Sequence, residues 1–325
     1  MCDPNTALGT IEAAAKATNT LGKIVEKIFG PSWKKKQVDA DAYSAEVIMK
    51  MIRDNPDMEI IYDDSKLHIK KRNVIALANR ADERKALEAV RQQYNLENVI
   101  GFAEGALNNK EKVNDKEIDE DFITRLFDIA KDANKREMQF IWGKILAQEV
   151  VEPGSFSLRT LEIVKNLGKK DADIFEKILA LVFKYNGTPF LIADGDFLKK
   201  YDVVYHDILL LEEFGLISPS GMVAITINLQ PSSHKVCYTN KALLLLSNNN
   251  NSEKNMNLNV YKFTISAIEL LKIIDINCNI GVIKDLERVL KTENRNIDIG
   301  MTMHKINYID ANGSISYDTT PLEFN

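Results

Sequence analysis

The chain has 325 residues, 45% of them hydrophobic, which is enough to bury one large core or two to three smaller ones. A formal net charge of −5 and a pI near 5.6 argue against the broad positive field of a nonspecific nucleic-acid binder, although they leave room for a local basic face. The sequence has no secretory signal pattern, no run near the ~20 apolar residues that span a bilayer, and three cysteines without metal-ligand spacing. We therefore expect a cytoplasmic globular protein with free thiols.

An alanine-rich amphipathic helix is predicted from Ala7 to Phe29. In the first interpretation its apolar stripe packs on its own chain or on a second subunit. A tryptophan and three lysines follow it, as they also do where a helix lies in a membrane interface, so a membrane-active effector is the second interpretation. The residues that would contact a partner or a membrane are Leu21, Ile24, Ile28, Trp33, Lys34, Lys35 and Lys36.

The next segment holds the one enzyme-like pattern in the sequence. A helix is predicted from Ser32 to Ile52 and a hairpin from Met58 to Lys71. Around this hairpin Asp57, Asp64 and Lys66 imitate the layout of metal-dependent nucleases, in which two carboxylates hold Mg²⁺ beside a lysine. Because the gap is too short to place Asp57 on a separate strand from Asp64, we interpret the pattern as a charged turn.

A long helical pattern runs from Asn73 to Leu107, with Tyr94-Asn95 and Gly101 as candidate interruptions. At about 1.5 Å per residue it would extend ~50 Å, too far for one compact domain to cover all its apolar positions. We therefore expect a helical hairpin or an oligomer interface along it. The polar residues 108–117 are interpreted as a linker.

Four amphipathic helices are predicted between Ile118 and Tyr185, and the short turns between them indicate a helical bundle. Acidic residues at positions 119–121 are interpreted as the cap of the first helix. The sequence FIWGKILAQE at 140–149, followed by PGSFSLRTL at 153–161, resembles the bacterial family catalogued as domain of unknown function 2806. In the order of its elements the chain is also distantly similar to the abortive-infection alpha proteins. That resemblance implies a role in phage defence or stress response, and neither resemblance supplies a catalytic residue.

A winged-helix-like unit is predicted from Val204 to Leu246, as a helix stopped at Gly215, a hairpin, and a helix from Asn240 to Leu246. A DNA reader needs Arg or Lys on its exposed helix and wing, but residues 205–214 and 218–226 contain neither. We therefore favour a protein-contact module and keep a DNA-binding regulator as the alternative.

An asparagine-rich stretch from Asn248 to Asn255 predicts a linker, after which a small α/β unit closes the chain. The elements predicted for this unit are a strand at 260–263, helices at 266–274 and 282–290, and strands at 300–309 and 314–317.

Motifs for catalysis are not found. Four histidines at 68, 206, 234 and 304 lie far apart, and the sequence contains no phosphate loop, dinucleotide fingerprint or nucleophile elbow. We expect no catalytic residue, cofactor or metal. The predicted fold is mainly α, with long helices in 1–113, a helical bundle plus winged-helix-like unit in 114–247, and a small α/β unit in 256–325. The predicted function is non-enzymatic and depends on self-association or on binding a protein partner.

Overall fold

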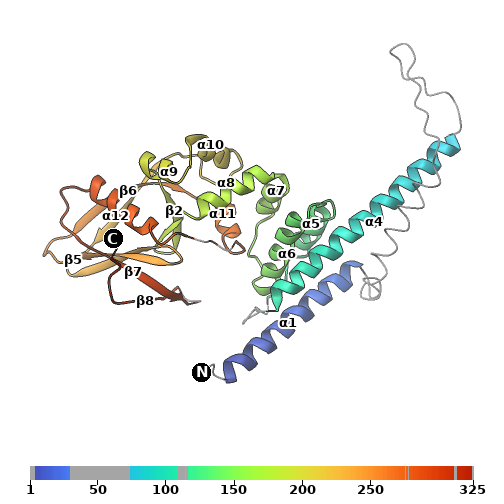
Figure 1. The fold of residues 1–325 in the computed structure, drawn as a ribbon. Coiled ribbons are helices and arrows are strands. Elements are labelled where there is room, and N and C mark those ends of the chain that lie inside the picture. Colours follow the sequence, from blue (N-terminus) through green and yellow to red (C-terminus); the bar gives the residue numbers. More distant parts are fainter. Residues whose placement is uncertain are drawn as a thin grey trace, which may run out of the picture. The chain divides into compact units, whose positions relative to one another are not determined.

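The computed structural model describes residues 4–29, 74–108, 114, 116–274, 276, 278–310 and 313–323, with side chains from residue 13 in the first helix and from residue 79 in the second. The chain divides into two compact units, Met1–Leu158 and Arg159–Asn325 (Figure 1). The helix expected from Ser32 to Ile52 and the hairpin expected from Met58 to Lys71 lie outside the described residues.

The first unit consists of helices. They are α1 (Pro4–Phe29), α4 (Val74–Leu107), α5 (Glu120–Ala130) and α6 (Arg136–Val151). The helix predicted up to Leu107 is confirmed as α4, which runs for 34 residues without a break at Tyr94-Asn95 or at Gly101. Its C-terminal half packs against α6 (Figure 1) and buries Leu96, Val99, Ile100, Ala103 and Leu107.

The helices α4 and α6 approach each other closely at Gly143. A Cβ atom at this position would lie 2.5 Å from the Cβ of Phe102 and 2.9 Å from the carbonyl oxygen of Val99. Carbon atoms in ordinary contact are about 3.5–4.0 Å apart, so only glycine fits here. The backbone of α6 therefore lies directly on α4.

The caps of the helices follow from the sequence. Asp119 accepts hydrogen bonds from the backbone N–H groups of Asp121 (2.8 Å) and Phe122 (3.3 Å), which confirms that the acidic run caps α5. At the end of α6 the buried carboxylate of Glu149 accepts from the N–H groups of Gly154 and Phe156. Gly154 has a φ of +86°, which allows the chain to turn there.

The second unit is built on an eight-stranded sheet with the order β3-β6-β2-β1-β4-β5-β7-β8, in which every neighbouring pair is antiparallel. The strands are β1 (Phe183–Tyr185), β2 (Thr188–Ile192), β3 (Val223–Leu229), β4 (Ser233–Tyr238), β5 (Ala242–Asn248), β6 (Lys254–Lys262), β7 (Gly300–Ile309) and β8 (Ile315–Tyr317). The helices are α7 (Leu158–Asn166), α8 (Lys169–Leu179), α9 (Gly195–Lys200), α10 (Tyr205–Glu213), α11 (Ile265–Leu270) and α12 (Val282–Glu293). Helix α12 packs on β5, β6 and β7.

The expectation of a mainly α fold with a small C-terminal α/β unit is wrong. The segment expected to form a helix from Asn240 to Leu246 is strand β5, in the interior of the sheet. Its apolar run is buried on both faces, and such a strand loses the alternating pattern that marks a strand exposed on one side. Without that helix the winged-helix-like unit is absent from this segment.

The linker expected from Asn248 to Asn255 is a tight connection inside the same sheet. The Asn248 side chain is fully buried and donates to the carbonyl groups of Leu229 (2.9 Å) and Ser252 (2.9 Å). Strands β6 and β7 therefore extend one sheet with β5 rather than forming a separate unit. The strands predicted at 300–309 and 314–317 are confirmed as β7 and β8, which pair antiparallel with each other.

The expected four-helix bundle is also wrong. The fourth helix was expected to reach Tyr185, but α8 ends at Leu179 and residues 183–185 form β1. The helices α7 and α8 belong with the sheet, whereas α5 and α6 pack with α4 in the other unit. The buried apolar residues of α8 face the sheet unit and not a helical bundle. The spacing of apolar residues along one helix shows which side is buried but not which element covers that side.

Candidate functional site

Of the residues expected to contact a partner or a membrane, three lie in the described part of α1. Leu21 is 1% exposed and belongs to a buried stripe with Ala17 and Val25. Ile24 is half-buried and Ile28 is 41% exposed. Trp33 and Lys34, Lys35 and Lys36 lie outside the described residues, as do Asp57, Asp64 and Lys66.

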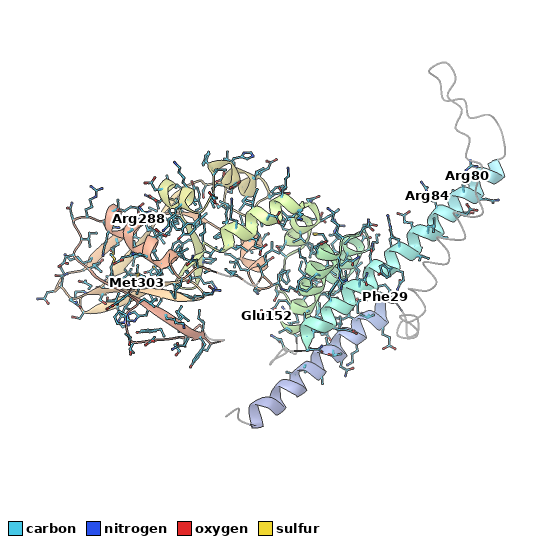
Figure 2. The ribbon with its side chains drawn as sticks, viewed as in Figure 1. Phe29, Arg80, Arg84, Glu152, Arg288 and Met303 are labelled. Atoms are coloured by element: carbon cyan, nitrogen blue, oxygen red, sulfur yellow. The ribbon has the colours of Figure 1, made fainter. Side chains whose placement is uncertain are left out.

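The helix α1 is held against its own unit. Phe29 meets Phe127 of α5 edge-on, with ring centroids 5.5 Å apart (Figure 2 labels Phe29), and Lys27 forms an ion pair with Glu120. Leu21 and Val25 are covered by α4 and α6. The stripe that would enter a lipid layer is therefore used within the unit.

A hollow of about 500 Å³ opens between α4 and the start of α6. Its lining includes the buried amides of Asn95 and Gln139, of which Asn95 donates to the carbonyl of Lys131 (2.7 Å) and Gln139 donates to Asn95 (3.0 Å) and to the carbonyl of Ala133 (2.8 Å). At its rim the guanidinium of Arg136 lies over the ring of Phe102, 5.7 Å from the centroid. Because the amides bond to one another, the network fastens α4 to the turn before α6.

A second apolar face of α4 is left uncovered by the described residues. Leu87, Val90 and Tyr94 recur at intervals of three and four, so they share one side of the helix. By helix geometry this side is nearly opposite the buried one, which carries Val99 and Ala103. Leu87 and Val90 are half-buried and Tyr94 is 41% exposed. We call Leu87, Val90 and Tyr94 the α4 face.

The N-terminal part of α4 reaches beyond the helices that pack on its other end. Figure 2 shows Arg80 and Arg84 on this part. Between residues 79 and 91 no side chain is buried, although Leu87 and Val90 lie within that range. A helix in water gains most of its stability from packing an apolar face, and the part of the chain that the structure describes does not bury such a face on this segment.

In the sheet unit, one buried carboxylate gathers several side chains. Asp285 of α12 accepts from Lys200 (2.8 Å) and from the hydroxyl of Tyr201 (2.7 Å), while Arg288 lies 3.9 Å from it and pairs with Asp194 (3.1 Å). Burial, and then the hydrogen bond to Asp285, raises the pKa of Tyr201 above its usual value. These contacts join α9 to α12. The carboxylate of Asp285 is therefore already bonded to side chains of its own unit.

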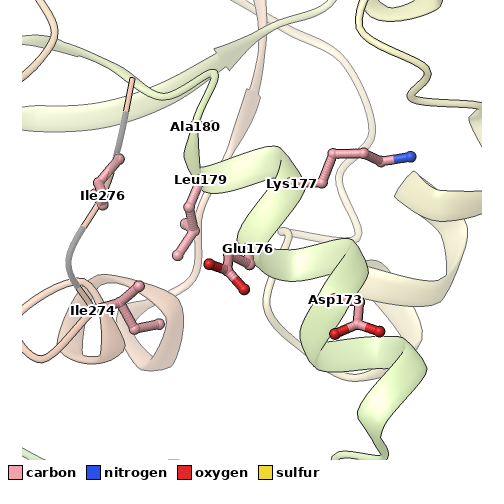
Figure 3. A pocket seen from close by; sticks show the side chains of 7 residues that line it. All are labelled: Asp173, Glu176, Lys177, Leu179, Ala180, Ile274 and Ile276. Carbon is pink, nitrogen blue, oxygen red and sulfur yellow. The ribbon is translucent and has the colours of Figure 1, made fainter. Parts of the chain in front are cut away.

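A second hollow, of about 320 Å³, lies beside α8 in the same unit. Figure 3 shows Asp173 and Glu176 on one side and Ile274 and Ile276 across from them, with Lys177 directed away. Lys177 instead pairs with Asp207 of α10 at 3.5 Å. Two separated carboxylates beside isoleucines do not form a recognisable catalytic or anion-binding arrangement.

Metal ligands and reactive thiols do not converge in the part of the chain that the structure describes. It contains no group of three His, Cys, Asp or Glu side chains able to hold a metal ion. Cys237 and Cys278 are buried free thiols, and burial raises the pKa of Cys237 to about 12. Among the described helices, none combines the length and hydropathy needed to cross a bilayer.

Reasoning from the sequence found the residues of the α4 face but not the face itself. In the sequence, Leu87, Val90 and Tyr94 are three of the apolar positions of one long helix. The signal that separates them was present, since their spacing places them out of phase with Val99 and Ala103. What each side of the helix meets depends on α6 and α1, which lie far away in the sequence.

Comparison with known proteins gives one match. A family model described as protein of unknown function (DUF2806) matches residues 79–287, which include most of α4 and end in α12. No curated protein and no solved structure matches the chain.

Proposed function

The chain belongs to the DUF2806 family, and from that premise we propose that it acts by contact with other protein molecules through its helical unit. The observation that carries this proposal is the α4 face, three apolar side chains on a helix segment without a buried side chain. Apolar residues at i, i+3 and i+7 are the pattern by which a helix docks on another protein. Fully burying an exposed Leu or Val side chain contributes about 1.5–3 kcal/mol, and because Leu87 and Val90 are already half-buried, covering the rest of each contributes roughly half of that.

The two alternative functions have less support. A membrane-active helix would have to free Leu21 and Val25 from their cover before it entered lipid. A DNA-binding regulator would need the winged helix, which is absent from this segment. Its recognition helix would be α10, which exposes Tyr205 and Leu209 and contains no Arg or Lys. The proposal places the protein in the cytoplasm, in keeping with its free thiols. A role in phage defence rests on the distant resemblance alone.

Photo-crosslinking in living bacteria tests the proposal. A benzoylphenylalanine placed at Leu87 lies on the α4 face, and the same group at the exposed Ala89 lies on another side of the helix. We expect an adduct heavier than the chain at position 87 and little at position 89. The mass of the adduct distinguishes a second copy of the chain from a different protein. Equal labelling at both positions, or none at either, would refute the proposal.

A further inference from the structure

The two edges of the sheet differ. At one edge β8 has only three residues, β7 shifts register beside it, and the chain after β8 continues along β7 through bonds from Asp318 N to Lys305 O (2.9 Å) and Leu322 N to Met303 O (2.7 Å). At the other edge β3 has seven residues and pairs with β6 alone, in continuous register from Val223 to Leu229. Short strands and irregularities blunt the first edge, and β3 lacks them.

The hydrogen bonds of β6 reveal which backbone groups of β3 point outward. The N–H groups of Asn257 and Asn259 donate to side chains at the end of α12, so these two residues face away from β3. Groups alternate along a strand, and therefore Met256, Leu258 and Val260 face β3 and bond their partners there. It follows that Ala224, Thr226 and Asn228 direct their N–H and C=O groups to the open edge. No bond from these groups is present among the described residues.

The sequence of β3, VAITINL, contains no charge, proline or glycine. Natural edge strands are protected by lysines, prolines or bulges, because an open ladder pairs with any other strand that fits. Val223 and Ile225, on the apolar side of the strand, are only half-buried, whereas Ile227 and Leu229 are fully buried. The edge thus presents both free hydrogen-bonding groups and incompletely covered apolar side chains.

We infer that β3 pairs antiparallel with β3 of a second copy of this chain, about a two-fold axis at Thr226, so that two eight-stranded sheets join into one. In this register each Thr226 faces its own counterpart, and Ala224 faces Asn228 of the second copy. All three are hydrogen-bonded pairs, so every outward N–H and C=O of the three residues finds a partner. If the two-fold axis passed through any other residue of β3, some of these N–H and C=O groups would have no partner.

The side chains agree with this register. On the apolar face, Val223 and Ile225 lie in register with Leu229 and Ile227 of the second copy, which are already buried within their own copy, and the added strand covers surface that Val223 and Ile225 still expose. On the other face the two Thr226 side chains lie opposite each other, a pairing that stabilises antiparallel strands. Because the strand has no charge, a two-fold axis brings no like charges together. The features of the strand therefore select a second copy as the partner.

Charge exchange at the axis tests the inference. Thr226 is exposed, and its hydroxyl makes one surface bond, to Asn257, so Thr226→Lys and Thr226→Glu leave the fold of each copy intact. Either variant alone places two like charges opposite each other and should raise the dimer dissociation constant about fivefold at low salt. A tagged Thr226→Lys chain should retain untagged Thr226→Glu far better than untagged Thr226→Lys. Asn255→Lys is the matched control, since Asn255 lies on the same face one strand inward, and it should dimerise like the parent.

Thr226→Pro provides a second variant. Its N–H points to the open edge, so proline removes a donor of the dimer and none of the chain's own ladder, and the dimer should weaken more than tenfold. Dimer mass is measured by light scattering on the full chain. A monomeric parent, or variants at Thr226 that dimerise like the parent, would overturn the inference. A Leu87→Glu chain that still dimerises separates this contact from the one proposed for the α4 face.

Discussion

Replacing Gly143 with alanine sets two known effects against each other. Alanine stabilises a helix interior by about 1 kcal/mol relative to glycine. At Gly143, however, the new methyl group would lie 2.5 Å from the Cβ of Phe102, 2.9 Å from Val99 O and 3.0 Å from Ala103 N. These atoms belong to the backbone or are fixed to it, so no side chain rotates away and the two helices must separate.

The close contacts decide whether Gly143→Ala raises or lowers the free energy of unfolding. Overpacking a core costs typically 1–3 kcal/mol, and a contact about 1 Å too short against backbone lies at the upper end of that range. Subtracting the gain in helix propensity, we expect Gly143→Ala to lower the free energy of unfolding by about 1–2 kcal/mol. Gly105→Ala in α4 is the control, because nothing lies within 4 Å of its Cβ position, and it should stabilise by about 0.5–1 kcal/mol.

Urea unfolding measures this difference. The chain has two tryptophans, so a Trp33→Phe background leaves Trp142, which is 1% exposed and adjacent to Gly143, as the fluorescent probe of the helical unit. The midpoints of unfolding are compared between variants whose free energy of unfolding has the same slope with urea concentration. This comparison avoids the error of extrapolating to zero urea. If Gly143→Ala were as stable as the parent, the close approach of α4 and α6 would be refuted.

Two further predictions concern side-chain networks. Removing one partner of the amide network, by Asn95→Ala, should cost about 1–3 kcal/mol, since Lys131 O and Gln139 lose a bond each, and a double-mutant cycle with Gln139→Ala should show coupling. Strictly additive effects would contradict the network. The raised pKa of Tyr201 means that above about pH 10 the unfolded chain loses this proton while the folded chain keeps it, so stability falls as the pH rises. Tyr201→Phe should make that fall shallower between pH 9 and 11 in urea midpoints, and an unchanged slope would contradict it.

Local signals in the sequence predicted the helices of the first unit well. The spacing of apolar residues and the acidic cap indicated α4 and α5, because both signals act within a few residues of each other. Strand β5 was wrongly predicted as a helix. A strand in the middle of a sheet is covered on both faces, and its leucine run has no alternation to distinguish it from a buried helix.

The candidate surfaces were less predictable than the elements that carry them. Leu87 and Tyr94 were visible as apolar positions, but the side on which α6 packs is decided by residues more than 40 positions away. The strand β3 was expected, whereas its place at the edge follows from the order of the whole sheet. Contacts between distant segments determine which surfaces remain open. Patterns within short stretches of one sequence do not show those contacts.

Deamidation of Asn248 would damage the sheet directly, because the side-chain amide of this residue is fully buried and hydrogen-bonded. Its nitrogen donates to the carbonyl groups of Leu229, Gln230 and Ser252, and so ties two turns of the sheet together. Spontaneous deamidation would replace this nitrogen with an oxygen and set a carboxylate against three carbonyl oxygens. Deamidation at this residue would therefore destabilise the sheet. Burial of the amide within the fold delays that reaction.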